Sequence, residues 1–195
     1  MSPSAASMAQ HSAPVEVELH WQTLAAARHE LDALIDSAEL ARIDALERAA
    51  DRGRSMVAAA TLRVAAAQRL GVAPLEVRID RTCDECGRQH GAPRLLHPHA
   101  PWVSVSHSGL LIAVVLADEP VGIDVQRVAD LPATQSAEAW VRAEAITKAQ
   151  GVARAVGVDP GRLAASAIDT PLPGYAAALA LRADSGRPRL RTFGP

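Results

Sequence analysis

Hydrophobic and polar residues alternate along several short segments of the chain, which is the pattern of half-buried β-strands. Residues 15–21 (VEVELHW) show this alternation clearly. Ser-Gly and Glu-Pro pairs favour short antiparallel hairpins among the segments that follow residue 101. The predicted strands cover residues 15–21, 75–80, 102–106, 110–117, 121–125 and 175–181.

Apolar residues at helical spacing predict three helices between these strands. Gly71 is expected to end the second helix and Gly151 the third. The predicted helices cover residues 37–50, 55–70 and 136–150. Residues 81–101 are rich in Gly, Pro, His and Cys and are expected to form a loop, and residues 1–14 are expected to be disordered. The fold class is therefore α+β.

The composition of the chain narrows the classes of protein to which it can belong. With 195 residues, 49% of them hydrophobic, it is long enough to bury one sizeable core or to form two packed lobes. Its 20 basic and 22 acidic residues give a net charge of −2, which argues against nucleic acid or a membrane as a partner. The start lacks a signal-peptide pattern, and the apolar run 110–117 is too short to span a bilayer. We therefore expect a cytoplasmic protein.

Asp124 is an acidic residue within the apolar segment 121–128 (VGIDVQRV). Burying an unpaired carboxylate costs several kcal/mol or more, so a strand keeps one only at an exposed end, in a cap, or at a metal or catalytic site. Glu144 and Lys148 lie four residues apart on the predicted helix and share a face. Alone they indicate a surface pair worth about 0.3–0.5 kcal/mol. With Asp124, however, Glu144 completes a pair of carboxylates that can hold Mg²⁺ beside a phosphate.

His107 lies between Ser106 and Ser108, where one predicted strand turns into the next. It is either a turn histidine satisfied by its neighbours, or a hydrogen-bond donor or base at a phosphate. Arg54 and Ser55 lie at the start of a predicted helix, where arginines and free N–H groups can bind anions. On these residues alone, a solvated basic turn is the preferred interpretation.

Both cysteines of the chain lie in CDECGRQH, at Cys83 and Cys86. In a reducing compartment this spacing favours metal or redox chemistry over a structural disulfide. One hypothesis is a zinc site built on these cysteines and His90, with His97 or His99 as the fourth ligand. Such an ion would be a structural clip on the loop and would not itself be the function.

Five motifs in order carry a resemblance to a known family. They are RS at a helix start (54–55), a GxP segment (91–93), SHS (106–108), GID (122–124) and EAxxK (144–148). As an ordered set they resemble the 4′-phosphopantetheinyl transferase superfamily, in a shortened and divergent form of its larger, monomeric, surfactin-synthetase-activating type. The segment CDECGRQHGAP also resembles a cysteine-containing loop of many actinobacterial-looking members.

The resemblance implies a fold, an activity and partners. Two similar α+β lobes, residues 15–118 and 119–195, would pack as a pseudo-dimer with coenzyme A and Mg²⁺ in the cleft between them. The implied enzyme is a monomeric holo-acyl-carrier-protein synthase of secondary metabolite biosynthesis. It would transfer 4′-phosphopantetheine from coenzyme A to a serine of an apo acyl- or peptidyl-carrier protein.

The resemblance also implies a role for particular residues, carried over position by position. The implied metal ligands are Asp124, Gln126 and Glu144. The implied catalytic residues are Glu144, Lys148 and His107. The implied coenzyme A-binding residues are Arg42, Arg54, Ser55, Ser106, His107 and Lys148.

The chain departs from the family pattern at three positions and in one segment. Gln126 stands where the family has a second acid, and Ala92 and Ala143 stand where it has lysines. The link 126–140 is short, which implies that part of the carrier-protein platform is missing. One interpretation is a weak or specialised enzyme. The alternative is a degenerate, non-catalytic coenzyme A or carrier-protein binding protein of the same fold.

Overall fold

A computed structural model describes residues 14–83, 85–185 and 188–194, so the expectation of a disordered start lies outside the described residues except at Pro14. The α-helices are α1 (Ser37–Asp44), α2 (Ala49–Leu70) and α3 (Ala137–Ala155). The β-strands are β1 (Glu16–Thr23), β2 (Ile79–Thr82), β3 (Gln89–Leu95), β4 (Trp102–Ser108), β5 (Leu111–Ala117), β6 (Gly122–Arg127), β7 (Leu163–Ala167), β8 (Tyr175–Arg182) and β9 (Arg189–Phe193). The 3₁₀ helices are η1 (Leu24–Ala26), η2 (His29–Leu34), η3 (Pro74–Glu76) and η4 (Val128–Asp130). The fold is mixed α+β, as the sequence predicts.

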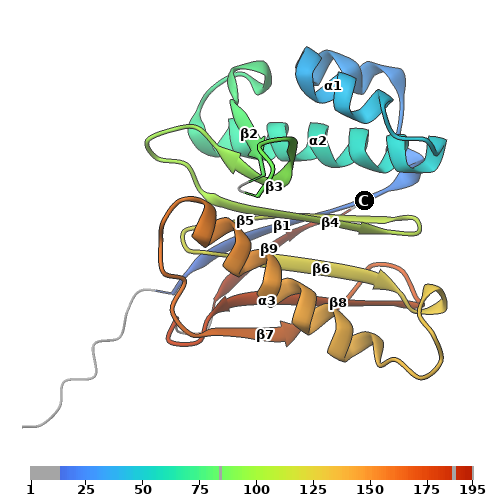
Figure 1. Ribbon diagram of the computed structural model, residues 1–195, viewed down its shortest axis with the longest axis vertical. Coiled ribbons are helices and arrows are strands. Elements are labelled where there is room, and N and C mark those ends of the chain that lie inside the picture. Colours follow the sequence, from blue (N-terminus) through green and yellow to red (C-terminus); the bar gives the residue numbers. More distant parts are fainter. Residues whose placement is uncertain (1–13, 84, 186–187, 195) are drawn as a thin grey trace, which may run out of the picture.

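The first sheet has the strand order β4-β5-β1-β9. β5 pairs antiparallel with β4 and with β1, while β9 runs parallel to β1. The predicted hairpin between β4 and β5 is therefore confirmed. α2 covers one face of this sheet, where Leu62 and Ala66 join Val103, Val114 and Leu116 in one apolar cluster (Figure 1).

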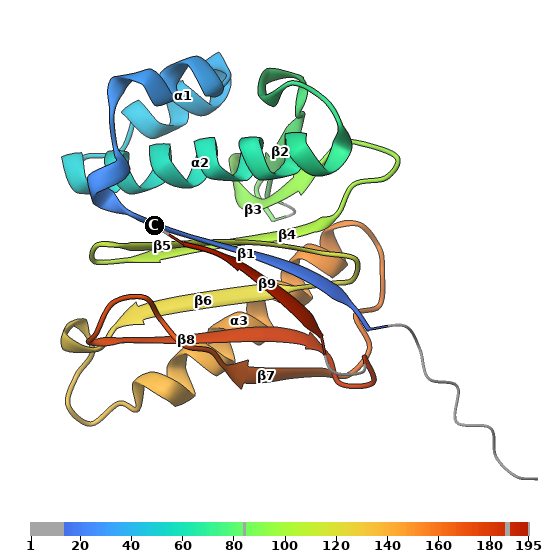
Figure 2. The same cartoon turned by 180° about the vertical axis from the view of Figure 1, so that it is seen from behind.

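The second sheet has the strand order β6-β8-β7, and its pairs are antiparallel. α3 packs on one face of it, where Val141, Ala145 and Ala149 contact Ala178 and Ala180 of β8. Figure 2 shows α3 and α2 on separate parts of the molecule, each against its own sheet. Each half therefore consists of a sheet covered by one long helix.

The sheet faces that the helices leave uncovered pack against each other and form the main core. The alternation predicted for residues 15–21 is confirmed, because Val17, Leu19 and Trp21 all point into this core. β5 is buried on both faces, so its sequence is a continuous apolar run without alternation. The other strands that contribute buried residues to this core are β6 and β8.

The structure corrects several helix boundaries. The first helix ends at Asp44 and the second begins at Ala49, so residues 49–54 belong to α2. Gly71 ends α2 as predicted, with a φ of 69° and its N–H donated to the carbonyl of Ala67. The prediction that Gly151 ends the last helix is wrong, since α3 continues to Ala155. The following residues, Val152 and Ala153, are buried, and their packing carries the helix through the glycine.

The structure also corrects the loop and strand predictions that concern β2, β3 and β6. Residues 81–101 are not one loop, because the end of β2 and all of β3 lie within them and pair as a hairpin. The strand predicted at 75–80 begins only at Ile79, after η3. β6 does not form a hairpin with β5, because β4 and β1 already occupy both edges of β5; it pairs with β8 instead.

Besides β3, two further strands have no counterpart in the predictions. β7 is short, alanine-rich and at most half-buried, and β9 is exposed along its length. Neither therefore shows a periodic apolar pattern. β9 joins the first sheet beside β1, so residues 189–193 depart from the lobe division expected between residues 118 and 119. The described helices include none that is both long and apolar enough to cross a bilayer.

Candidate functional site

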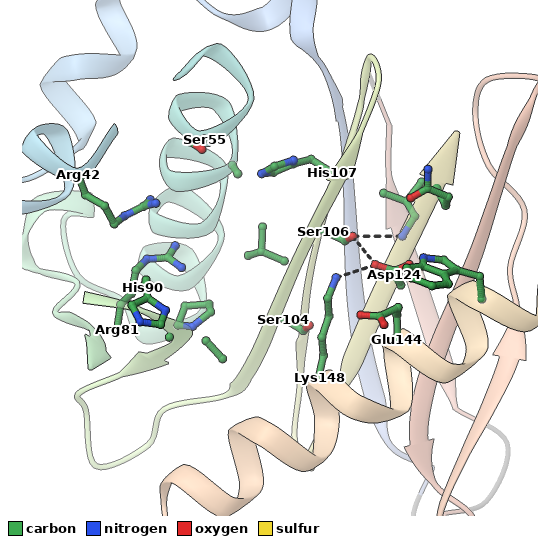
Figure 3. A pocket seen from close by; sticks show the side chains of 18 residues that line it. Arg42, Ser55, Arg81, His90, Ser104, Ser106, His107, Asp124, Glu144 and Lys148 are labelled. Carbon is green, nitrogen blue, oxygen red and sulfur yellow. Dashed lines mark hydrogen bonds and ion pairs between the residues drawn. The ribbon is translucent and has the colours of Figure 1, made fainter. Parts of the chain in front are cut away.

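A cavity of about 520 Å³ brings together side chains from both halves of the fold. Figure 3 shows Arg42, Arg81 and His90 on one side of it, and Asp124, Glu144 and Lys148 on the other. Its lining residues are Arg42, Ser55, Ala58, Arg81, His90, Gly91, Ala92, Pro93, Ser104, Val105, Ser106, His107, Asp124, Val125, Gln126, Trp140, Glu144 and Lys148. Of the residues implied as functional, only Arg54 is absent from this lining.

Serine side chains of β4 hold β6 in place, although the two strands belong to different sheets. Alternate residues of a strand face the same side, so three serines spaced by two point toward β6. Each serine hydroxyl oxygen accepts a backbone N–H of β6, and this row of contacts replaces ordinary strand pairing. The contacts join Ser104 to Ile123 (3.2 Å), Ser106 to Val125 (3.2 Å) and Ser108 to Arg127 (2.9 Å).

Gly122 allows α3 to lie directly on β6. A Cβ atom at this position would lie 1.9 Å from the carbonyl oxygen of Ala145 and 2.8 Å from the backbone nitrogen of Ala149. Only a glycine facing two small helical residues permits so close an approach. The contact brings Glu144 and Lys148, which adjoin these alanines, next to the strand that carries Asp124.

Asp124 is buried, with 8% of its side chain exposed, but it is not unpaired. Its Oδ1 accepts a hydrogen bond from the Ser106 hydroxyl (2.8 Å) and another from Lys148 Nζ (2.7 Å). Lys148 Nζ also donates to the carbonyl oxygen of Ile123 (3.2 Å). These contacts offset the cost of burying the carboxylate.

Glu144 does not form the surface pair with Lys148 that its spacing allows. Lys148 reaches Asp124 instead, and across the three described ranges Glu144 has no ion-pair or hydrogen-bond partner. Its carboxylate lies beside Asp124 and Lys148 in the cavity (Figure 3). Gln126 also lines the cavity, although its amide nitrogen donates to the neighbouring carbonyl of Arg127 (3.1 Å). The carboxylates of Asp124 and Glu144 and the amide of Gln126 thus all face the cavity.

His107 lines the cavity, and nearby protein atoms remove part of its hydration although the residue is exposed to solvent. Burial lowers its pKa from the ordinary value of 6.5, and the positive charges of Arg54 and Lys148 lower it further. The imidazole is therefore neutral at neutral pH, with one nitrogen able to donate a hydrogen bond and the other able to accept one.

A cluster of arginines makes the opposite wall of the cavity basic. Glu39 is buried and accepts hydrogen bonds from Arg42 (3.3 Å), Arg63 (3.3 Å) and Arg81 (2.9 Å). Arg63 also pairs with Asp36. Three guanidinium groups thus face two carboxylates, and the excess positive charge lies where Arg42 and Arg81 border the cavity. Sequence reasoning missed Arg81, which stands at the start of what was expected to be a loop.

Arg54 and Ser55 point in different directions, because successive helical residues are about 100° apart. Ser55 is buried and lines the cavity. Arg54 instead donates to the carbonyl oxygen of Gly109 (2.8 Å) and pairs with Asp51. It therefore supports the turn between β4 and β5 and acts on the cavity only through its charge.

Cys83, Cys86 and His90 lie close enough together to bind a metal ion, with their ligand atoms all within 4.8 Å of one another. Hydrogen bonds from Arg88, and next from His90, lower the pKa of the Cys86 thiol to about 6. Neither His97 nor His99, the two alternatives for a fourth ligand, is part of the cluster that the described residues form. Since His90 also lines the cavity, this cluster lies at the cavity's edge.

Comparison of the sequence with protein-family models and with curated proteins found no match. The kind of ligand that the cavity can bind is therefore inferred from the residues that line it. Guanidinium groups on one wall can bind an anionic ligand, and carboxylate and amide oxygens on the other can bind a hard cation such as Mg²⁺. A ligand that carries several phosphates would use both walls.

Proposed function

We propose that this protein is a 4′-phosphopantetheinyl transferase that modifies a serine of an acyl- or peptidyl-carrier protein. The observation that carries the proposal is the meeting of Asp124, Glu144 and Lys148 in one cavity. Asp124 comes from β6, whereas the other two come from α3. Their motifs are far apart in the chain and resemble those of this family in order. Ser106 and His107, from a third motif, line the same cavity.

The arrangement of elements supports the 4′-phosphopantetheinyl transferase fold. Each half of the molecule consists of a sheet with one long helix, α2 or α3, on its outer face. The inner faces of the two sheets share one core, as expected of a pseudo-dimer. The cavity takes residues from both halves, which is where such a pseudo-dimer would bind coenzyme A.

The proposed reaction joins the serine hydroxyl oxygen of the carrier protein to the β-phosphorus of coenzyme A. The bond between that phosphorus and the oxygen bridging to the α-phosphate breaks, and 3′,5′-ADP leaves with the electron pair. Glu144 takes the serine proton, directly or through a water, because its carboxylate has no partner among the described residues. Lys148 stabilises the charge that develops on the phosphate oxygens, and the neutral His107 donates a hydrogen bond to a phosphate oxygen.

The donor set of the cavity fits Mg²⁺. Asp124 and Glu144 offer carboxylate oxygens and Gln126 an amide oxygen, which are the ligands that hard cations prefer. When bound, Mg²⁺ would neutralise the negative charge of the pyrophosphate. Because Gln126 lacks a charge, this ligand set predicts a weaker metal affinity than three carboxylates would give.

Two lysines expected from the family pattern are absent, and arginines of the cavity wall offset the one missing at Ala92. Ala92 lines the cavity where a phosphate-facing lysine was expected. Arg42 and Arg81 supply positive charge on the same wall (Figure 3). Positive charge on this wall supports coenzyme A binding, and Glu144, which has no partner in the described part of the chain, favours an active, specialised enzyme over a degenerate binding protein.

Mass spectrometry of apo carrier proteins tests the proposal. Carriers of the polyketide, nonribosomal peptide and fatty-acid types would each be incubated with this protein, coenzyme A and Mg²⁺. We expect at least one carrier to gain the mass of a single phosphopantetheine. The gain should disappear with Asp124→Asn but persist with Asp130→Asn, a control on exposed η4.

Coenzyme A binding measured by calorimetry separates the two interpretations of a negative result. If coenzyme A binds and no carrier in the panel is modified, the non-catalytic binding protein replaces the transferase. If neither binding nor transfer occurs, the cavity serves another ligand and the proposal fails.

A further inference from the structure

A second set of metal-ligating atoms lies at the tip of the β2–β3 hairpin. The sulfur atoms of Cys83 and Cys86 and a ring nitrogen of His90 all lie within 4.8 Å of one another. Cys86 Sγ is 2.9 Å from His90 Nε2. Around a tetrahedral zinc ion, with bonds of about 2.0–2.3 Å, ligand atoms lie about 3.3–3.8 Å apart. The three atoms therefore need only small movements to bind one ion.

The backbone holds both cysteines on one tight turn. The N–H of Gly87 donates to the carbonyl of Cys83 (2.8 Å), and the N–H of Cys83 donates to the carbonyl of Arg88 (2.8 Å). Gly87 has a φ of 70°, a conformation that residues with a side chain rarely adopt. β3 then brings His90 back beside the turn. These bonds bring the two cysteines and His90 near one another before a metal ion binds.

The chemistry of these ligands favours zinc. Both cysteines are free thiols, and thiolate together with imidazole selects Zn²⁺ over the hard cations Mg²⁺ and Ca²⁺. We propose that Cys83, Cys86 and His90 bind one Zn²⁺ ion, with a water molecule as the fourth ligand. This site is separate from the carboxylates of Asp124 and Glu144.

The zinc ion has a structural consequence for the cavity. Arg81 on β2 and residues 90–93 on β3 line the cavity; the two cysteines lie between these segments in the chain, and His90 belongs to the second. Gly91 lies close to β2, since a Cβ there would be 3.0 Å from the carbonyl oxygens of Arg81 and Thr82. The ion ties the ends of both strands together and thereby holds this wall in place. The inference does not depend on the identity of the cavity's ligand.

Metal titration of the full chain tests the site. The protein would be stripped of metal, kept in a non-chelating reductant, and titrated with Co²⁺, whose thiolate charge-transfer and visible bands report tetrahedral sulfur ligation. Zn²⁺ would then displace the cobalt, and the zinc content would be measured by elemental analysis. We expect one equivalent of metal to bind.

Substitutions of the proposed ligands and of one control residue test which side chains bind the metal ion. Cys86→Ser and His90→Ala should each weaken Co²⁺ binding by more than about 10-fold, since loss of a group that merely hydrogen-bonds to a metal ligand already costs that much. His99→Ala, a nearby exposed histidine outside the cluster, should bind as the parent does. Hydrogen exchange should show slower exchange of residues 82–91 when zinc is bound.

Clear outcomes would overturn the inference. Absence of the charge-transfer band in the reduced protein would show that the cluster binds no metal. Weaker Co²⁺ binding by His99→Ala would show that His99, and not a water molecule, is the fourth ligand. If zinc leaves the hydrogen exchange of residues 82–91 unchanged, the ion does not stabilise the hairpin. Far-ultraviolet circular dichroism of each variant checks that a loss of binding does not reflect unfolding.

Discussion

Replacing Gly122 by alanine adds one methyl group at the contact between β6 and α3. That carbon would lie 1.9 Å from the carbonyl oxygen of Ala145, whereas ordinary contact begins at 3.4 Å, so the helix must move away by about 1.5 Å. The neighbouring atoms are backbone atoms of a helix and cannot rotate aside. Overpacking of this kind costs about 1–3 kcal/mol of stability.

The same movement should damage the cavity more than it damages the fold. Lys148 is 2.7 Å from Asp124, and a shift of about 1.5 Å would take the two groups out of hydrogen-bond range. A displacement of about 1 Å in a catalytic group can reduce the rate about 100-fold. We therefore expect Gly122→Ala to lose about 100-fold in phosphopantetheine transfer while it still folds.

Urea unfolding followed by circular dichroism, together with the transfer assay, measures both effects. Gly151→Ala is the matched control, because it lies on the same helix and a Cβ there meets nothing within 4 Å. The control should be as active as the parent and more stable by up to about 1 kcal/mol, the difference in helix propensity. A Gly122→Ala variant with parental stability and parental activity would refute the reasoning that this contact positions α3.

Three further predictions concern residues that line the cavity. Gln126→Glu should lower the Mg²⁺ concentration needed for half-maximal transfer, because it restores a charged ligand; an unmoved titration curve would place the residue outside the metal's ligands. Glu144→Gln should abolish transfer and change the free energy of unfolding by less than about 1 kcal/mol, whereas Glu138→Gln on the exposed first turn of α3 should retain activity. Stability should fall as the pH drops below about 6.5, since burial lowers the pKa of His107 in the folded state and the unfolded chain takes up the proton first. His107→Gln should make this fall shallower but not remove it, because the pKa of His20 is lowered too; equal slopes in urea titrations at several pH values would contradict the assignment.

Local sequence patterns predicted the elements whose environment is simple. The alternation in residues 15–21 identified a strand with one buried face, and Gly71 marked a helix end that needs a positive φ. The patterns failed where burial is slight. β7 and β9 are at most half-buried, so they lack the contrast between faces on which periodicity depends.

The residues of the candidate site could be chosen from sequence motifs, but their partners could not. Ser106, His107, Asp124, Glu144 and Lys148 were all expected to be functional, and all line one cavity. Motif order made that choice possible. It did not predict that the serines of β4 bind the backbone of β6, because that contact spans two sheets.

By itself the sequence determined the α+β class, the β4–β5 hairpin and the chemical groups available for a site, because these depend on residue type and near neighbours. The tertiary structure decided which of those groups meet. Lys148 has Glu144 four residues away on its own helix, yet it bonds to Asp124, 24 residues away in the chain. Gly122 determines this choice, because the missing side chain lets α3 lie against β6 and brings the ammonium to a buried carboxylate that must be paired. The contact depends on the packing distance between α3 and β6, and that distance cannot be predicted from a local pattern of residues.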